Sequence, residues 1–369
     1  SGARAADAVT VAEPEPAEYV KICDVYGAGY FYIPGTETCL RIGGYVRYDI
    51  GLGDVGSFDG AKSIDALNGK EQGTWKKNAR FTLKTWTGQE TELGTLKTYT
   101  ETRFNFGNGS GWSGGSDGSA NTNPAHNSGV SLNFAWIQLG GLRVGKDESA
   151  FNTFIGYAGN VIQDTIVPYG DFDTNVVQYY FDAGNGFSAV VSLEEGSGTG
   201  NGYRGTIDSY VPHVVGGVKY TQGWGAITGV AAYDSTYEEW AGKIRADFNV
   251  TSELSLFGMF GYGSDRHTVD FANGRDFYKQ WGGHWAFWAG GTYKFNEKTA
   301  FNLQVSGDQD KNYGVAANVA YTAVPGFTVT AEVDYDHYGH FGDPNVFGNW
   351  TNANKKNSVG GILRFQRDF

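Results

Sequence analysis

The stretch Trp240-Ala241-Gly242-Lys243-Ile244-Arg245-Ala246-Asp247-Phe248-Asn249-Val250 decides the fold class. Its even positions are apolar or small, whereas its odd positions from 243 to 249 carry two basic residues, one acid and one amide. This period of two is the signature of a β-strand, whose side chains point alternately to opposite faces. Residues 301–308 and 327–336 alternate in the same way. We therefore predict an all-β protein built from strands with one apolar and one polar face.

Segments of this kind recur from Leu40 to the C-terminus and number about 16. They are about as long as a tilted strand needs to cross a membrane, and short turns alternate with long Gly-, Asn- and Ser-rich connections, the pattern of bacterial outer-membrane barrels. The apolar faces then contact lipid and the polar faces line a wet interior. The sequence predicts a transmembrane antiparallel β-barrel with strands at 40–50, 78–87, 94–106, 129–139, 142–145, 175–183, 187–194, 213–221, 225–234, 239–249, 254–262, 284–295, 299–308, 313–322, 327–338 and 357–369.

Composition excludes several function classes. The formal charge is −12, from 28 basic and 40 acidic residues. Affinity for nucleic acid comes mainly from Lys and Arg meeting phosphate, so no nucleic-acid partner is expected. No run of 18 apolar residues is present, which excludes a transmembrane helix.

The two ends of the chain suggest export and membrane assembly. Ala3-Arg4-Ala5 fits a signal-peptide cleavage site, so residues 1–5 are expected to be a signal-peptide remnant. Cys23 and Cys39 are the only cysteines, and exported proteins usually pair such a couple. We predict a disulfide within a periplasmic segment 6–39, followed by the barrel at 40–369. Phe369 and Phe365 on the last strand match the terminal signal that the outer-membrane assembly machinery recognises.

Several stretches closely resemble the general porins of rhizobial and Brucella-type alphaproteobacteria. They are Tyr19–Arg41, Glu92–Thr98, Ile137–Gly145 and the ending Arg364–Phe369. The resemblance covers essentially the whole chain, and the segment flanked by the cysteines is its most specific part. It implies a 16-stranded homotrimeric diffusion porin for small hydrophilic solutes and ions, with a third external loop folded into the lumen.

Strand parity assigns the side chains that face the lumen. The inward basic residues of the first three strands and the last strand share one arc of wall, because barrel closure places the last strand beside the first. The third long connection, 146–174, carries acids and the apolar residues Phe151, Phe154, Ile155 and Tyr157. If it folds inward, acid faces base across a narrow gap and sets a transverse field. We expect a constriction formed by the basic wall Arg41, Arg47, Arg80, Lys84, Lys97, Arg103 and Arg364 and the acidic loop residues Asp147, Glu148 and Asp164.

Two other functions remain open. A channel selective for oligosaccharides would need an aromatic track, and Tyr45, Trp86, Tyr99 and Trp288 are predicted to face inward. A secreted β-rich carbohydrate-binding protein would instead bury its apolar faces. We expect no enzyme, cofactor or metal site, because the carboxylate and His pairs that the chain carries lie at strand edges or lack ligand spacing.

Membrane context defines the remaining expected partners. The outward Thr98, Thr100 and Thr102 are too polar for lipid and suggest a contact between subunits of a homotrimer. Outer-membrane lipid and lipopolysaccharide would surround the rest of a multi-pass protein of the bacterial outer membrane.

Overall fold

The computed structural model describes residues 20–53, 60–108, 124–198, 204–266, 276–341 and 355–369. The expected signal-peptide remnant, residues 1–5, lies outside this range, as do residues 6–19 of the expected periplasmic segment.

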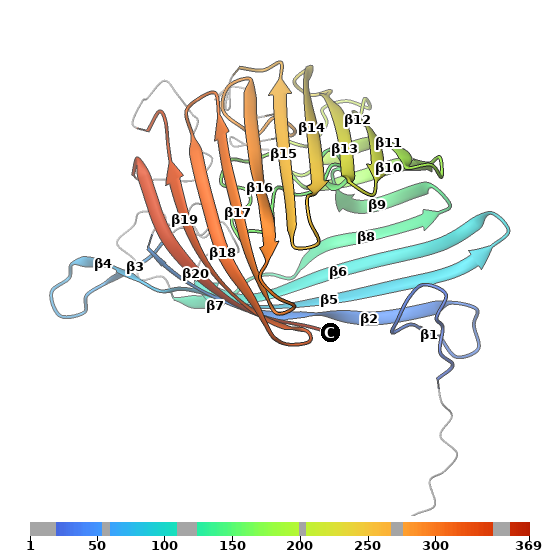
Figure 1. Cartoon of the computed structure of the whole chain (residues 1–369), viewed down its shortest axis with the longest axis horizontal. Helices are drawn as coiled ribbons and strands as arrows, with labels where there is room; N and C mark the ends of the chain where they lie inside the picture. Colours follow the sequence, from blue (N-terminus) through green and yellow to red (C-terminus); the bar gives the residue numbers. More distant parts are fainter. Residues whose placement is uncertain (1–19, 54–59, 109–123, 199–203, 267–275, 342–354) are drawn as a thin grey trace, which may run out of the picture.

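One antiparallel sheet of 18 strands contains nearly all of the regular structure (Figure 1). Two of its members, β1 (Phe31–Tyr32) and β7 (Ala125–Asn127), are short additions, which leaves 18 − 2 = 16 strands in the wall. Each wall strand pairs with the next, and β20 pairs with β2, so the sheet closes on itself. The prediction of a barrel of about 16 strands is confirmed. The wall strands are β2 (Cys39–Gly53), β5 (Lys76–Thr91), β6 (Gly94–Asn108), β8 (Ser131–Leu139), β9 (Leu142–Glu148), β10 (Asp173–Asp182), β11 (Phe187–Gly196), β12 (His213–Gln222), β13 (Gly225–Asp234), β14 (Glu239–Asn249), β15 (Leu254–Gly263), β16 (Trp285–Lys294), β17 (Thr299–Asp308), β18 (Tyr313–Val324), β19 (Phe327–His337) and β20 (Asn357–Asp368).

The predicted alternation of faces is confirmed, and its direction is opposite to that of a water-soluble protein. In β14 the side chain of Lys243 is 4% exposed, whereas that of its neighbour Ile244 is 58% exposed. The same holds in β2, where Asp49 is buried and Val46 is exposed. Polar residues therefore point inside the barrel and apolar residues point outside it, as a barrel surrounded by lipid requires.

The strand boundaries differ from the prediction mainly at the first three wall strands. β2, β5 and β6 extend beyond 40–50, 78–87 and 94–106, because their ladders continue to the ends of the strands. The predicted turn 88–93 shortens to residues 92–93, since Thr91 pairs with Gly94. A further hairpin of β3 (Ala61–Ile64) and β4 (Glu71–Thr74) lies within the connection 51–77 and projects from one end of the barrel (Figure 1).

The predicted disulfide joins Cys23 to Cys39 and closes a small lobe at the start of the barrel. Within this lobe β1 pairs with the first residues of β2. In Figure 1 the lobe lies at the end of β2 opposite to the β3–β4 hairpin. The lobe is thus attached to the rim where β5 and β6 are joined by their short turn.

The C-terminus completes the closure of the barrel. Phe369 donates its backbone N–H to the Gly44 carbonyl (3.0 Å) and accepts from the Gly44 N–H (3.1 Å). The Phe369 side chain is 52% exposed.

The buried apolar cluster lies inside the barrel and against one side of it. It combines the segment that follows β9, the residues that precede β16 and the inward side chains of β11–β16. The described chain contains one α-helix, α1 (Ala150–Thr153), and no described helix is long and apolar enough to cross a membrane.

Candidate functional site

The segment between β9 and β10 begins with a capped helical turn. Ser149 is the N-cap of α1, and its hydroxyl oxygen accepts from the Phe151 N–H (3.1 Å). The inward carboxylate of Glu194 on β11 accepts from the Ser149 hydroxyl (2.6 Å) and the Ala150 N–H (3.0 Å). A carboxylate at this position stabilises the free N–H groups of the first turn. Glu194 therefore ties the start of the segment to the barrel wall.

The middle of the segment is held through its backbone carbonyls. Wall side chains with inward parity supply the donors, because an unpaired buried carbonyl would cost free energy. Arg245 donates to Tyr157 O (2.6 Å), Gln304 to Asp164 O (2.8 Å), Trp288 to Val167 O (2.7 Å) and Lys243 to Tyr169 O (2.8 Å).

Glu332 on β19 anchors the far side of the segment. Its two carboxylate oxygens accept from the backbone N–H groups of Ile162 (2.6 Å) and Gln163 (3.0 Å). Hydrogen bonds to a charged acceptor are roughly twice as strong as neutral ones. The segment thus contacts inward-facing side chains on β11, β14, β16, β17 and β19.

Apolar packing accompanies these polar contacts. Phe151, Phe154 and Ile155, which the sequence singled out as unusual for a loop in water, are 0%, 7% and 3% exposed. Tyr157, the fourth of that set, differs: it is 43% exposed, and its hydroxyl donates to Glu148 (3.0 Å).

A cavity of about 540 Å³ lies between this segment and the opposite wall. Basic side chains of β2, β5 and β6 face acidic side chains at the end of β9 and in the segment after it. Five of the predicted constriction residues line this space, which we call the constriction cavity: Arg47, Arg80, Arg103, Glu148 and Asp164.

The three arginines differ in how their charge is compensated. Arg47 donates to the neutral amide of Gln366 (2.8 Å), and Arg80 donates to that of Asn105 (2.9 Å). Arg103 instead pairs with the Glu101 carboxylate at 2.9 Å. Arg47 therefore contributes positive charge to the wall side of the cavity, because its hydrogen-bond partner is neutral.

Three other predicted residues are engaged in ion pairs next to the cavity and do not line it. Lys84 lies 3.7 Å from Glu101, Arg364 binds Asp49 through two hydrogen bonds, and Asp147 accepts from Arg143 at 2.8 Å. Asp49 and Arg143 largely neutralise the charges of Arg364 and Asp147, whereas Lys84 shares the single charge of Glu101 with Arg103.

Arg41 and Lys97 lie nearer the rim that carries the disulfide lobe. Arg41 stacks on the Trp86 ring (4.2 Å), and Lys97 pairs in register with Gly88, four residues before the β5–β6 turn. Neither residue lines the constriction cavity.

Several lining residues were not named among the predicted site. Tyr45 was predicted to face inward, but only as part of a possible aromatic track, and the same parity could have found Phe134. Phe172 and Asp173 follow from no local pattern, because their position depends on the path of the segment before β10.

The electrostatics of the cavity depend on Asp164. Its carboxyl is enclosed by protein, although part of the residue reaches the cavity, and Tyr169 donates to it at 2.7 Å. Burial raises the pKa of Asp164 to about 7, and the Glu332 and Glu148 carboxylates add to this rise against the hydrogen bond from Tyr169. The charge of the acidic side therefore changes near neutral pH.

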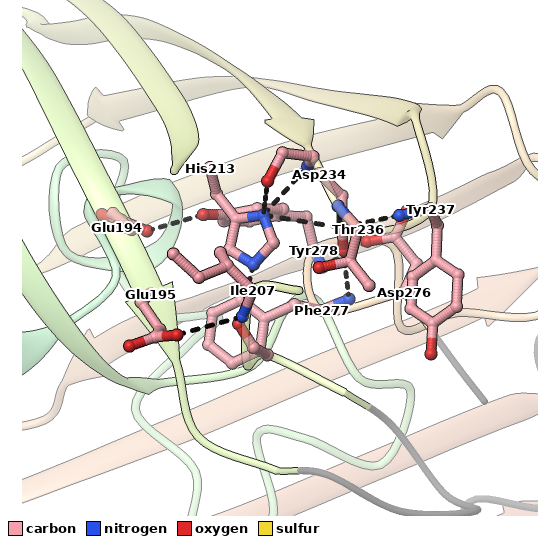
Figure 2. A network of polar contacts seen from close by, with 12 residues as sticks. Glu194, Glu195, Ile207, His213, Asp234, Thr236, Tyr237, Asp276, Phe277 and Tyr278 are labelled. Carbon is pink, nitrogen blue, oxygen red and sulfur yellow. Dashed lines mark hydrogen bonds and ion pairs between the residues drawn. The ribbon is translucent and has the colours of Figure 1, made fainter. Parts of the chain in front are cut away.

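A second buried polar network joins the outer ends of β11–β13 to the segment before β16 (Figure 2). His213 is fully buried; its Nε2 contacts Gly205 O (2.7 Å), and its Nδ1 accepts from the Ser235 N–H (3.0 Å). These contacts fit the neutral tautomer with the proton on Nε2, so the 3.4 Å approach to Asp234 is no ion pair.

One acid of this network also joins two separate segments. Tyr278 donates to Glu194 (2.9 Å), which links the segment before β16 to the start of α1. Burial and the neighbouring Asp234 raise the pKa of Asp276 well above its ordinary value. The neighbouring residue Glu195 accepts from the Ile207 N–H (3.1 Å) on the other side of the strand. We interpret the network as structural.

The residues proposed for an aromatic track separate into two groups. Trp86 and Tyr99 are partly exposed and adjacent, with ring centroids 5.6 Å apart. Trp288 is fully buried behind the segment after β9, and Tyr45 is 6% exposed. Among the described residues, no group of three or more His, Cys, Asp or Glu side chains is arranged to hold a metal ion.

Comparison with known proteins gives consistent matches. The family model described as "Porin subfamily" matches residues 7–362. Porin Omp2b of Brucella suis and porin Omp2b of Brucella melitensis are each 50% identical to the chain, over all of this chain and 95% of the relative.

Solved structures share the fold at low sequence identity. The channel DcaP of Acinetobacter baumannii has a TM-score of 0.63 at 13% identity and covers 92% of this chain and 99% of its own. An anion-selective porin from Comamonas acidovorans has a TM-score of 0.54 at 14% identity, covering 90% of this chain and 100% of its own.

Proposed function

Because the chain belongs to the porin subfamily, and is therefore a multi-pass channel of the bacterial outer membrane, we propose that the constriction cavity is the narrowest part of its diffusion path. Small hydrophilic solutes and ions move passively down their gradients through the lumen. The segment 149–172 restricts that lumen, and the residues around the cavity decide which solutes pass.

The observation that carries this proposal is the arrangement of charge around the cavity. Arg47, Arg80 and Arg103 lie on one side, and Glu148 and Asp164 lie on the other. Opposed charges across a narrow aqueous gap orient dipolar solutes and act on ions of each sign differently. Lys84, Arg364 and Asp147 support this arrangement through their ion pairs, without lining the gap.

The single-channel conductance of the purified protein, compared with a variant that lacks residues 149–163, tests the proposal. The variant should conduct more current per channel, because the restricting segment is shorter. Unchanged migration of the unheated variant on a gel controls for folding. Equal conductance of a folded variant would show that this segment does not restrict the path.

We further propose that the channel is a homotrimer whose subunits meet along β5 and β6. The outward hydroxyls of Thr85 and Thr100, and those of Thr87 and Thr98, bond to each other and form a polar strip on the outer face. Such a strip suits a protein contact better than lipid. Thr98→Lys with Thr100→Lys should convert heat-labile trimers into monomers on gels, and persistence of the trimer would contradict this interface.

The remaining roles follow from the same membrane context. We propose that residues 6–39 are periplasmic, that residues 40–369 form the pore domain, and that Phe365 and Phe369 serve assembly. Lipid and lipopolysaccharide surround the exposed apolar bands, and the chain acts as a channel without a catalytic role. Of the alternatives, a channel selective for oligosaccharides has partial support from Trp86 and Tyr99, which are partly exposed and adjacent.

A further inference from the structure

A cluster of aromatic side chains lines the inner wall close to the β5–β6 turn. Trp86, Tyr99 and Trp136 occupy successive strands in register, because Trp86 pairs with Tyr99 and Tyr99 pairs with Trp136. The ring centroid of Tyr99 lies 5.6 Å from that of Trp86 and 5.9 Å from that of Trp136. All three rings are partly exposed and have inward parity. They therefore form one aromatic cluster, and part of its surface reaches the water of the lumen.

Three cations flank this cluster. The Arg143 guanidinium lies 3.7 Å from the Trp136 ring centroid and is already paired with Asp147, so the other two carry the argument. The Arg41 guanidinium lies 4.2 Å from the Trp86 ring centroid, so it is stacked in cation–π geometry. Lys97 lies on the other side of β5, opposite Gly88, and its side chain is exposed. In the described part of the chain, no ion pair engages either Arg41 or Lys97, in contrast to Lys84, Arg103 and Arg364.

The disulfide lobe contacts the wall next to this cluster. The Tyr26 ring packs so closely over Gly88 that a Cβ there would lie 2.6 Å from it, and its hydroxyl donates to Glu90 (3.0 Å). Gly29 at φ +89° brings the lobe backbone against the Arg41 side chain, 3.3 Å from the position of a Cβ. A larger residue at Gly88 would displace Tyr26, and one at Gly29 would crowd Arg41.

From these contacts we propose that Trp86, Tyr99, Trp136, Arg41 and Lys97 form a binding station at the periplasmic mouth for flat aromatic anions. An aromatic carboxylate stacks on the ring surface while its charge meets the guanidinium and the ammonium. A neutral sugar can also stack on the rings and accept hydrogen bonds from Arg41 and Lys97, but only an anion gains a charge-assisted bond, so the two cations favour the aromatic anion. The station lies outside the constriction cavity. The proposal rests on the proposed channel function and adds aromatic anions to the solutes that the channel recognises.

The test is the reversible block of single-channel current by benzoate added to the periplasmic side. Cyclohexanecarboxylate is the matched probe, since it carries the same charge without a π-face. We expect benzoate to block at concentrations at which cyclohexanecarboxylate does not. Trp86→Leu or Arg41→Gln should weaken the apparent Kd about tenfold or more, the usual loss for one stacking contact.

Lys294→Gln provides the control variant. It removes one positive charge from the same rim, at the end of β16 on the opposite side of the barrel. We expect it to keep the wild-type block. Equal block by both probes, or equal weakening by Lys294→Gln, would reduce the effect to general electrostatics and overturn the station.

The absence of benzoate block in the wild-type channel and in every variant would also overturn the binding station. The current without any probe reports separately on the channel, so failure of the station is distinguishable from failure of conduction.

Discussion

Replacing Arg47 with Gln should make the channel more selective for cations by an amount that the cavity dimensions set. A sphere of about 540 Å³ has a radius of about 5 Å, which places an ion at its centre about 5 Å from each lining charge. One unit charge at that distance in water contributes about 0.8 kcal/mol, which salt at about 0.1 M reduces to about 0.5 kcal/mol. Because cations and anions respond with opposite sign, their permeability ratio should change about fivefold.

The assay is the zero-current potential of the purified channel in a planar bilayer under a tenfold KCl gradient. From an unselective starting pore, a fivefold preference for cations moves this potential by roughly 30 mV. Arg47 is the best choice because it bonds the neutral Gln366 amide, so its removal leaves no unpaired carboxylate behind. Lys294→Gln removes an equal charge far from the cavity and should shift the potential by only a few millivolts. A shift for Arg47→Gln no larger than that of Lys294→Gln would refute the assignment.

Three further predictions address other parts of the molecule. Because the pKa of Asp164 is raised to about 7, its carboxyl gains negative charge as pH rises from 6 to 8, and zero-current potentials should move toward cation preference over that range. Asp164→Asn should reduce this change, since Glu148 is the other acid of the predicted site that lines the cavity, and an undiminished change would contradict the role of Asp164. Cys23→Ser with Cys39→Ser should destabilise the lobe by about 3 kcal/mol and expose it to protease while the barrel keeps its gel mobility; an equally resistant lobe would contradict this. Glu332→Ala removes two charge-assisted hydrogen bonds, each worth roughly 1.5–3 kcal/mol, so channel currents should become noisier, whereas Glu253→Gln in an exposed turn should leave them steady.

The sequence was sufficient to predict the wall of the barrel because each strand carries its own evidence. In β14 the alternation of Lys243 and Arg245 with Ile244 and Phe248 defines both faces without any distant partner. Because consecutive strands are neighbours in a barrel, strand parity was enough to predict that Arg47 and Arg80 lie on the same arc of the inner wall.

Strand parity predicts which face a side chain is on. It does not predict how far along the strand the residue lies or which residue of the next strand it pairs with. Lys97 lies three residues after Gly94 and pairs with Gly88, so it is near the rim of the barrel and away from the constriction cavity. Arg364 lies opposite Asp49 in the β2–β20 ladder, and that pairing neutralises a charge that parity alone leaves free. The anchors Glu194 and Glu332 were also missed as such, since each binds a segment far away in the chain.

The central claim is that Arg47 faces the ion path while its neighbour Val46 faces outward. Single cysteines introduced as Arg47→Cys and Val46→Cys, in a chain whose own cysteines are joined to each other, test this by reaction with a charged, water-soluble methanethiosulfonate. The account predicts stepwise loss of current for Arg47→Cys and no change for Val46→Cys. Current loss confined to Val46→Cys would place the polar faces of the strands outside the barrel and contradict the account.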